Sequence, residues 1–357
     1  MTTETLSKKQ ALTKKAATVA TYYKPSTWKE KGIWWTAGLF LITYLIIIVI
    51  LGIYWSRSPD LYDVREQALS LATSNPPELV TGNATAATAI RIGETLLDKP
   101  GGYLTNDVTP PGLFLDNMPN WEFGVLTAWR DLLHNLRNDF SRAQSQSVEN
   151  KDLAIAQPQS NYQSDSWQLP STESEYRTGI DALYRYNQEL SDTSATDAMF
   201  FARADNLATY LEMVEKRLGS LAQRLSYAVG QSRLATALAG DRSARQSTPV
   251  PEQTHTKTPW MQIDDIFFEA RGYTWALLHQ LQALEIDFAP VLEDKNAMVS
   301  LQQIIRELRN TQNTIWSPLI LNGSGFGPMA NHSLVMASYI SRVNAAIADL
   351  RNLMKDG

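Results

Sequence analysis

Apolar residues along most of the chain recur at alternating spacings of three and four, which is the pattern of one buried helix face. The clearest stripes cover residues 200–228, 263–288 and 336–354. Shorter stripes predict helices over residues 125–140, 180–190 and 298–315. No strand pattern of comparable strength accompanies them. The sequence therefore predicts a mainly α fold.

Such stripes fit either a helical bundle or a long dimeric coiled coil. Alanines and charged residues both flank the stripe at 200–228, so the flanking residues do not distinguish a bundle from a coiled coil. Several such helices lie in one chain, which favours an antiparallel bundle within that chain.

One segment, residues 33–55, is apolar without interruption and contains no charged side chain over 23 residues. As a helix it is about 34 Å long, enough to cross a hydrocarbon core of about 30 Å. Aromatic residues lie at both ends, where such rings prefer the headgroup layer. A cleaved signal peptide is the alternative, but its apolar region is shorter and ends at a small-residue cleavage site. The pattern favours a single uncleaved transmembrane helix.

Charge predicts the orientation of that helix. The first 32 residues contain seven lysines and two glutamates, and basic segments stay cytoplasmic. We expect the N-terminus inside a bacterial inner membrane and the remainder in the periplasm. Because the whole chain has a net charge of −5, the part beyond the tail is strongly acidic, which argues against nucleic-acid binding.

Composition divides the chain further. Residues 1–32 form a basic cytoplasmic tail, and 56–140 a membrane-proximal helical segment with a Gly/Pro loop. Two polar stretches, 141–172 and 240–259, predict a linker and a disordered linker because neither can bury much apolar surface. They enclose long amphipathic helices over 173–239 and precede a C-terminal helical segment over 260–357.

Familiar reaction chemistry is not evident. The chain has no cysteine, and its four histidines have no metal-ligand spacing. We therefore predict no catalytic residue, no metal and no cofactor. Five tryptophans near helix starts or on helix faces favour core packing over exposed partner anchors: Trp121, Trp129, Trp260, Trp275 and Trp316.

Two loops rich in glycine and proline interrupt the helical pattern, at 99–122 and 321–332. Asn117 or Asn120 is the expected cap of the helix after the first, and Asn331 or Ser333 of the helix after the second. Loops on rigid scaffolds often bind partners. If the two loops meet, the candidate binding surface comprises Tyr103, Asn106, Asp107, Asp116, Asn117, Trp121, Asn322, Phe326 and His332.

The stretches KPGGYLTNDVTPPG, DNMPNWEFGVL and LNGSGFGPMANHSLVMASYISR, at 99–112, 116–126 and 321–342, carry a resemblance. They resemble an uncharacterised gammaproteobacterial single-pass inner-membrane family, domain-of-unknown-function family 2333. The resemblance implies a bacterial inner-membrane setting and supplies no catalytic residues.

The sequence favours a membrane-anchored periplasmic adaptor or scaffold that binds another envelope protein, with homo-oligomerisation open. The alternative is a periplasmic enzyme or small-ligand binder that acts on a cell-envelope component. It would use Asp107, Asp116 and His332 in one cleft.

Overall fold

The computed structural model describes residues 13–15, 17–72, 78–143, 148–192, 197–234, 253–317 and 319–355. The chain divides into two compact units, Met1–Trp55 and Ser56–Gly357. Residues 1–12 and 16 of the predicted tail lie outside the described residues.

The first unit contains α2 (Pro25–Lys31) and α3 (Ile33–Trp55). The bounds of α3 match the predicted span, and none of its 23 residues is buried. Within the described residues it is the one helix long and apolar enough to cross a membrane. A membrane anchor and a signal sequence both fit a helix of this length near the N-terminus.

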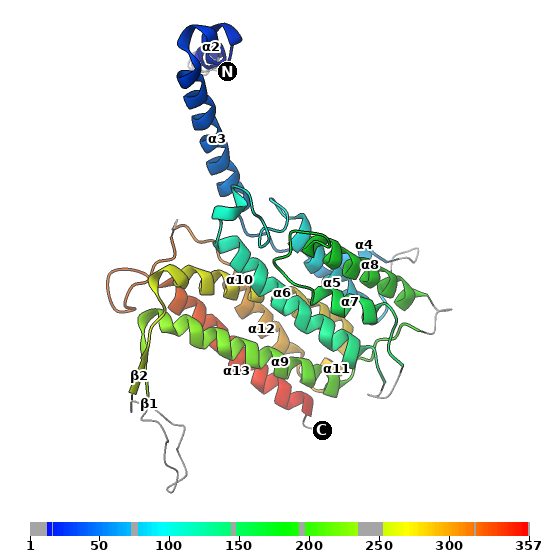
Figure 1. The fold of residues 1–357 in the computed structure, drawn as a ribbon. Coiled ribbons are helices and arrows are strands. Elements are labelled where there is room, and N and C mark those ends of the chain that lie inside the picture. Colours follow the sequence, from blue (N-terminus) through cyan, green and yellow to red (C-terminus); the bar gives the residue numbers. More distant parts are fainter. Residues whose placement is uncertain are drawn as a thin grey trace, which may run out of the picture. The chain divides into compact units, whose positions relative to one another are not determined.

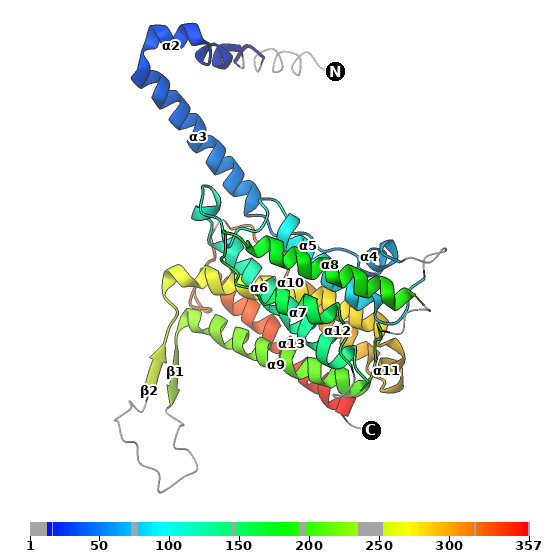
Figure 2. The same cartoon turned by 45° about the vertical axis from the view of Figure 1, so that its right-hand side comes forward.

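The second unit is a helical bundle, as the apolar stripes predict (Figures 1 and 2). Its α-helices are α4 (Val64–Ser70), α5 (Asn83–Asp98), α6 (Asn117–Asn135), α7 (Leu153–Ser160), α8 (Thr172–Ser191), α9 (Ala204–Ser226), α10 (Ile263–Asp287), α11 (Ala289–Asp294), α12 (Met298–Asn310) and α13 (His332–Lys355). Shorter turns are η1 (Gly112–Phe114), η2 (Leu136–Phe140), η3 (Tyr227–Val229) and η4 (Trp260–Gln262).

Helix α10 is the centre of the bundle and packs against α5, α6, α9, α12 and α13. Its contact with α6 is very close, because a Cβ added to Gly272 would lie 2.0 Å from the Trp121 carbonyl oxygen. A Cβ on Gly124 would likewise lie 2.0 Å from the Glu269 carbonyl oxygen. Glycine at both positions therefore allows the two backbones to touch.

The two long stripes nearest the C-terminus pack against each other, since α9 lies along α13 (Figure 1). Leu211, Leu218 and Leu225 of α9 are buried, as are Ile340 and Ile347 of α13. The apolar seam of α9 is thus covered within the chain, in agreement with the bundle prediction.

Segment 141–172 differs from the predicted linker. Its described part contains α7, which packs on α8 and buries Leu153, Ala156 and Ser160. Helix α7 contributes only a few apolar side chains of its own, because α8 provides the apolar surface on which they pack. The polar composition of the segment therefore did not predict this helix. The second predicted linker lies outside the described residues over 240–252. Its last residues include β2 (Gln253–Thr256), which pairs antiparallel with β1 (Gln231–Leu234).

The tryptophan prediction holds for the bundle interior and fails at its edge. Trp121, Trp129 and Trp275 are fully buried, and the Trp121 and Trp275 rings are 5.3 Å apart. Trp260 and Trp316 are instead 70% and 93% exposed. Both exposed residues lie outside the regular α-helices, in η4 and in the connector after α12.

Candidate functional site

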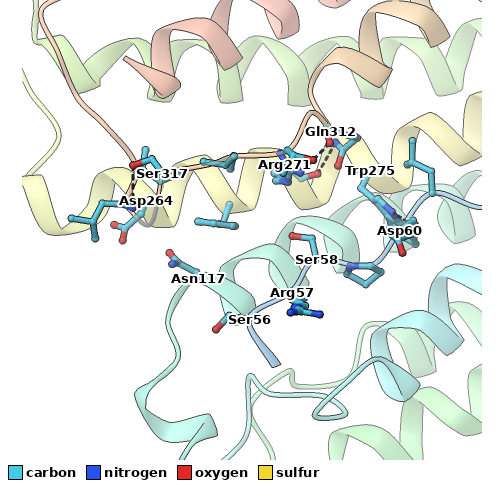
Figure 3. Close-up of a pocket in the computed structure, with 17 residues that line it drawn as sticks. Ser56, Arg57, Ser58, Asp60, Asn117, Asp264, Arg271, Trp275, Gln312 and Ser317 are labelled. Carbon is cyan, nitrogen blue, oxygen red and sulfur yellow. Dashed lines mark hydrogen bonds between the residues drawn. The ribbon is translucent and has the colours of Figure 1, made fainter. Parts of the chain in front are cut away.

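A cleft of about 640 Å³ lies where four segments of the second unit meet (Figure 3). It is lined by the chain that follows Trp55, the first turn of α6, the first half of α10 and the connector after α12. The lining residues are Ser56, Arg57, Ser58, Pro59, Asp60, Leu61, Asn117, Asp264, Phe268, Arg271, Trp275, Gln312, Thr314, Ile315, Ser317, Leu319 and Ile320.

The entering segment is fixed to α10 through Tyr62 and Asp60. The Tyr62 N–H donates to Nε2 of His279 over 3.2 Å, and the two rings stack with centroids 4.0 Å apart. The Trp275 indole N–H donates to the Asp60 carbonyl over 3.3 Å (Figure 3). Burial lowers the pKa of His279 to about 4, so the ring is neutral at pH 7 and its Nε2 can accept. The start of the second unit is therefore bonded to the core.

Arg271 forms the inner wall of the cleft. Its buried guanidinium donates to the carbonyls of Thr311, Gln312 and Asn313 at 3.3, 3.0 and 2.9 Å. Burial lowers its pKa, and within the described residues it forms no ion pair. The three carbonyls follow the C-terminus of α12, where the helix dipole favours a cation. Arg271 thus fixes the connector that forms the opposite side of the cleft.

The mouth of the cleft is polar and mixed in charge. Asn117 and Asp264 face each other across it, and Arg57 and Asp60 line the entering segment (Figure 3). The Asn117 Oδ1 is buried and has no hydrogen-bond partner. A cleft of this size with converging polar groups can bind a small polar ligand. Among the described residues, no group of three or more His, Asp or Glu side chains is placed to hold a metal ion.

Three predicted residues of the first loop interact with α8 and the segment before it. The Tyr103 ring is buried edge-on against Tyr176, 5.8 Å away. Asn106 donates to the Ser166 carbonyl over 2.9 Å and to Oε2 of Glu173 over 3.0 Å. Burial, and then the nearby Glu173 charge, raise the pKa of Asp107.

The next three predicted residues lie at the start of α6. Asp116 is exposed and caps the helix, since its side chain accepts from the Asn117 N–H over 2.8 Å. The cap is therefore Asp116, and the predicted caps Asn117 and Asn120 are wrong by one and four positions. Asn117 lines the cleft, whereas Trp121 is buried in the core with its indole N–H unpartnered.

The last three lie in the second loop. Asn322 donates to the Ala228 carbonyl over 3.0 Å, and Phe326 is fully exposed. His332 Nδ1 accepts from the Leu321 N–H over 3.1 Å, and burial lowers its pKa. The predicted cap Asn331 is confirmed, because its Oδ1 accepts from the Leu334 N–H over 2.9 Å.

His332 lines a neighbouring groove of about 330 Å³ rather than the cleft. This groove shares Arg271, Thr314, Ile315 and Ser317 with the cleft, so the connector separates the two hollows. Asp107, Asp116 and His332 have different neighbours, and neither hollow is lined by more than one of them.

Sequence reasoning missed three residues that organise this region. Glu122 and Lys99 form a buried ion pair beneath the first loop, and His279 holds the entering segment. Glu122 shares the helix face of Val125 and Trp129, both buried. A charge on an apolar helix face is a signal that would have found it.

No curated protein and no solved structure matches the chain. A family model described as "Uncharacterized protein conserved in bacteria" (DUF2333) matches residues 28–357, which include α3 and the whole second unit. The chain therefore belongs to the DUF2333 family of bacterial proteins.

Proposed function

We propose that this protein is a membrane-anchored adaptor that binds another envelope protein through its second loop. In this proposal α3 crosses the bacterial inner membrane, the N-terminus is cytoplasmic and the second unit is periplasmic. Supporting the span, α3 carries neither a charge nor a buried side chain. Supporting the orientation, the residues before α3 are rich in lysine.

The observation that carries the proposal is an exposed apolar tip on a firmly held loop. Phe326 is fully exposed and Met329 is 57% exposed. At the base of the loop, the Gly323 N–H donates to the Ala330 carbonyl over 2.9 Å, and the His332 N–H donates to the Leu321 carbonyl over 3.0 Å. An apolar tip with its base fixed loses little entropy on binding, which suits it to contact a partner.

The groove beside His332 extends this contact surface. Trp316 and Val335 line it and are both largely exposed, while Phe267 and Tyr339 form its walls. Exposed tryptophan next to a groove is a common anchor in protein interfaces. The tip residues Phe326 and Met329 and the groove residues Trp316 and Val335 are called the partner surface below.

The test is site-specific photocrosslinking of the full-length protein in its native membrane. A photoreactive phenylalanine analogue replaces Phe326, Trp316 or Val335 in turn. Val299 on α12 provides a matched control, because it is apolar and 74% exposed but lies outside the partner surface. We expect one discrete crosslinked protein from the three surface positions and none from Val299. Equal labelling from all four positions would contradict the proposal, and a crosslink between two copies would identify a homo-oligomer as the partner.

Orientation needs its own measurement. A phosphatase that is active only in the periplasm is fused after Gly357. We expect an active fusion, whereas a well-expressed but inactive fusion would overturn the periplasmic placement.

A second candidate function is the binding of a small envelope component in the cleft. The specific observation is the buried, unpartnered Oδ1 of Asn117 in a cleft that the buried Arg271 also lines. Cell-wall fragments are tested for thermal stabilisation of the full-length protein. Stabilisation that Asn117→Leu abolishes would support this function, and the same stabilisation in the variant would remove the cleft as its origin.

A further inference from the structure

Of the large apolar side chains that are exposed outside the partner surface, five lie on short turns or connectors at one end of the bundle. Leu113 and Phe114 belong to η1, Trp260 and Met261 to η4, and Leu319 to the connector after α12. Their exposed fractions lie between 57% and 78%. These five residues are called the apolar rim below.

A hydrogen bond joins the segments that carry the rim. The Asn120 Nδ2 donates to Oδ1 of Asp265 over 2.7 Å, which ties the first turn of α6 to the first turn of α10. Helix α6 begins three residues after Phe114, and α10 begins directly after η4. Both helices start at the same end of the bundle (Figure 1). Leu319 lines the cleft together with Asn117 and Asp264, so the third segment reaches the same place.

The second unit begins at this end, because its first residue, Ser56, lines the cleft with Asn117 (Figure 3). Leu319 lines the same cleft, and Ser56 follows Trp55 directly in the sequence. Consecutive Cα atoms are about 3.8 Å apart, so no free tether separates the cleft from the last residue of the apolar helix. The surface around Ser56 is therefore the part of the second unit that the chain connects most directly to α3.

We infer that the apolar rim inserts into the interfacial layer of the bilayer that α3 crosses. This inference rests on the proposed membrane anchoring and adds a second, peripheral attachment to it. Tryptophan, phenylalanine and leucine side chains on short turns are typical of surfaces buried at the headgroup boundary. The rim seats the second unit on the membrane, and it thereby fixes the height at which the partner surface stands.

Charge near the rim indicates how it binds. Asp116 lies next to η1 and Asp264 next to η4, while Arg57 and Asp60 lie together in the entering segment. Among these four groups the carboxylates outnumber the guanidinium, which does not favour anionic headgroups, so apolar insertion rather than charge attraction drives the contact. The attachment is therefore expected to be insensitive to salt and to the content of anionic lipid.

The chain contains no cysteine, which permits a direct test with single labels. Full-length protein with one cysteine at Phe114, Met261 or Leu319 is nitroxide-labelled and reconstituted into vesicles of phosphatidylethanolamine and phosphatidylglycerol. Spin relaxation by oxygen, which concentrates in lipid, is compared with relaxation by a water-soluble nickel complex. Two controls accompany them, Ile46 within α3 and the 74% exposed Val299 on α12.

We expect the three rim labels and the Ile46 label to relax mainly with oxygen, and the Val299 label mainly with nickel. The rim result should not change at high salt or in vesicles of phosphatidylcholine alone. If Ile46 reports lipid while the rim labels match Val299, the inference is overturned and the anchor stands. If Ile46 also reports water, both the anchor and the rim are overturned, whereas crosslinking at Phe326 still tests the partner surface independently.

Discussion

The first loop, residues 99–116, and the second, residues 321–331, differ in where their polar backbone groups find partners. In the first, the Leu104 and Thr105 N–H groups each donate to Glu122 over 2.9 Å, and Lys99 is paired with the same carboxylate. In the second, side chains bond the two ends of the loop and leave its tip in solvent. Two loops rich in glycine and proline therefore differ: the start of the first is held against the bundle, and the tip of the second projects outward.

The position of a single charge explains the difference. Glu122 is fully buried, and a buried carboxylate is stable only when donors surround it. Lys99, Leu104 and Thr105 at the start of the first loop supply those donors, so this part of the loop is held against the bundle. The second loop has only the neutral Asn322, Asn331 and His332 at its base, which satisfy a few groups without drawing in the tip.

Among the substitutions that test this comparison, Glu122→Gln should lower the free energy of unfolding the most. The substitution leaves the Lys99 ammonium buried without a counter-charge, which costs about 3–5 kcal/mol in the free energy of unfolding. Chemical denaturation of the full-length protein in detergent measures this loss. Glu293→Gln, at an exposed position, is the matched control. A loss as small as that of the control would mean that Glu122 does not hold the first loop.

Asn331→Ala tests the base of the second loop and should have a smaller effect. It removes the cap of α13 and the hydrogen bonds from Nδ2 to Asn322 Oδ1 and the Gly323 carbonyl, at 2.9 and 2.6 Å. We expect a loss of about 1–2 kcal/mol, typical of a lost cap with its hydrogen bonds. Hydrogen exchange should accelerate in residues 321–334 and stay unchanged at Leu104. Acceleration in both loops would contradict their independence; Asn352→Ala, exposed on α13, is the control.

Acidification should loosen the second loop. Burial lowers the pKa of His332 below its ordinary 6.5, so the unfolded chain binds this proton more readily than the folded chain. The contribution of the neutral ring is complete above pH 6.5 and is lost as the pH falls through the folded pKa, because protonated Nδ1 no longer accepts from the Leu321 N–H. Exchange of the Leu321 amide, corrected for its intrinsic rate, should therefore rise between pH 7.5 and 5. His332→Asn, which cannot titrate, should flatten this dependence, and an identical pH profile in the variant would refute the assignment.

Phe326→Ser should have the smallest effect on stability and a large effect on binding. The side chain is fully exposed, so the change in the free energy of unfolding should stay within about 0.5 kcal/mol. Crosslinking from the neighbouring position Val335 should fall if the tip contacts a partner. Undiminished crosslinking from Val335 would exclude Phe326 from the partner surface.

Much of the fold followed from the sequence. The span over 33–55 matches α3, and the stripes over 263–288 and 336–354 lie in α10 and α13 to within a few residues. The prediction was weaker where packing outweighs local composition. Helix α7 lies in a predicted linker. Helix α12 ends at Asn310 rather than at the predicted residue 315, because Arg271 binds the carbonyl groups that follow Asn310.

The candidate binding residues were harder to predict than the helices. Asn117 lines the cleft and His332 the groove, but Tyr103, Asn106 and Trp121 are buried in structural contacts. Polar residues in a loop can bond their own backbone, a neighbouring helix or a ligand, and sequence alone does not distinguish these partners. Trp260 and Trp316 show the same limit, because a stripe indicates which face is apolar and not whether another helix covers it.

The sequence by itself determined the apolar helix at 33–55, the mainly helical bundle and the two interrupting loops. These features depend on contacts within a few residues, namely on helical periodicity, on uninterrupted apolar length and on the turns imposed by glycine and proline. Tertiary structure alone decided that Glu122 holds the start of the first loop against the bundle, that Phe326 stays in solvent, and that Ser56, Asn117 and Leu319 share one cleft. These outcomes depend on burial and on partners far away in sequence, which exist only once α6, α10 and the connector after α12 have packed together.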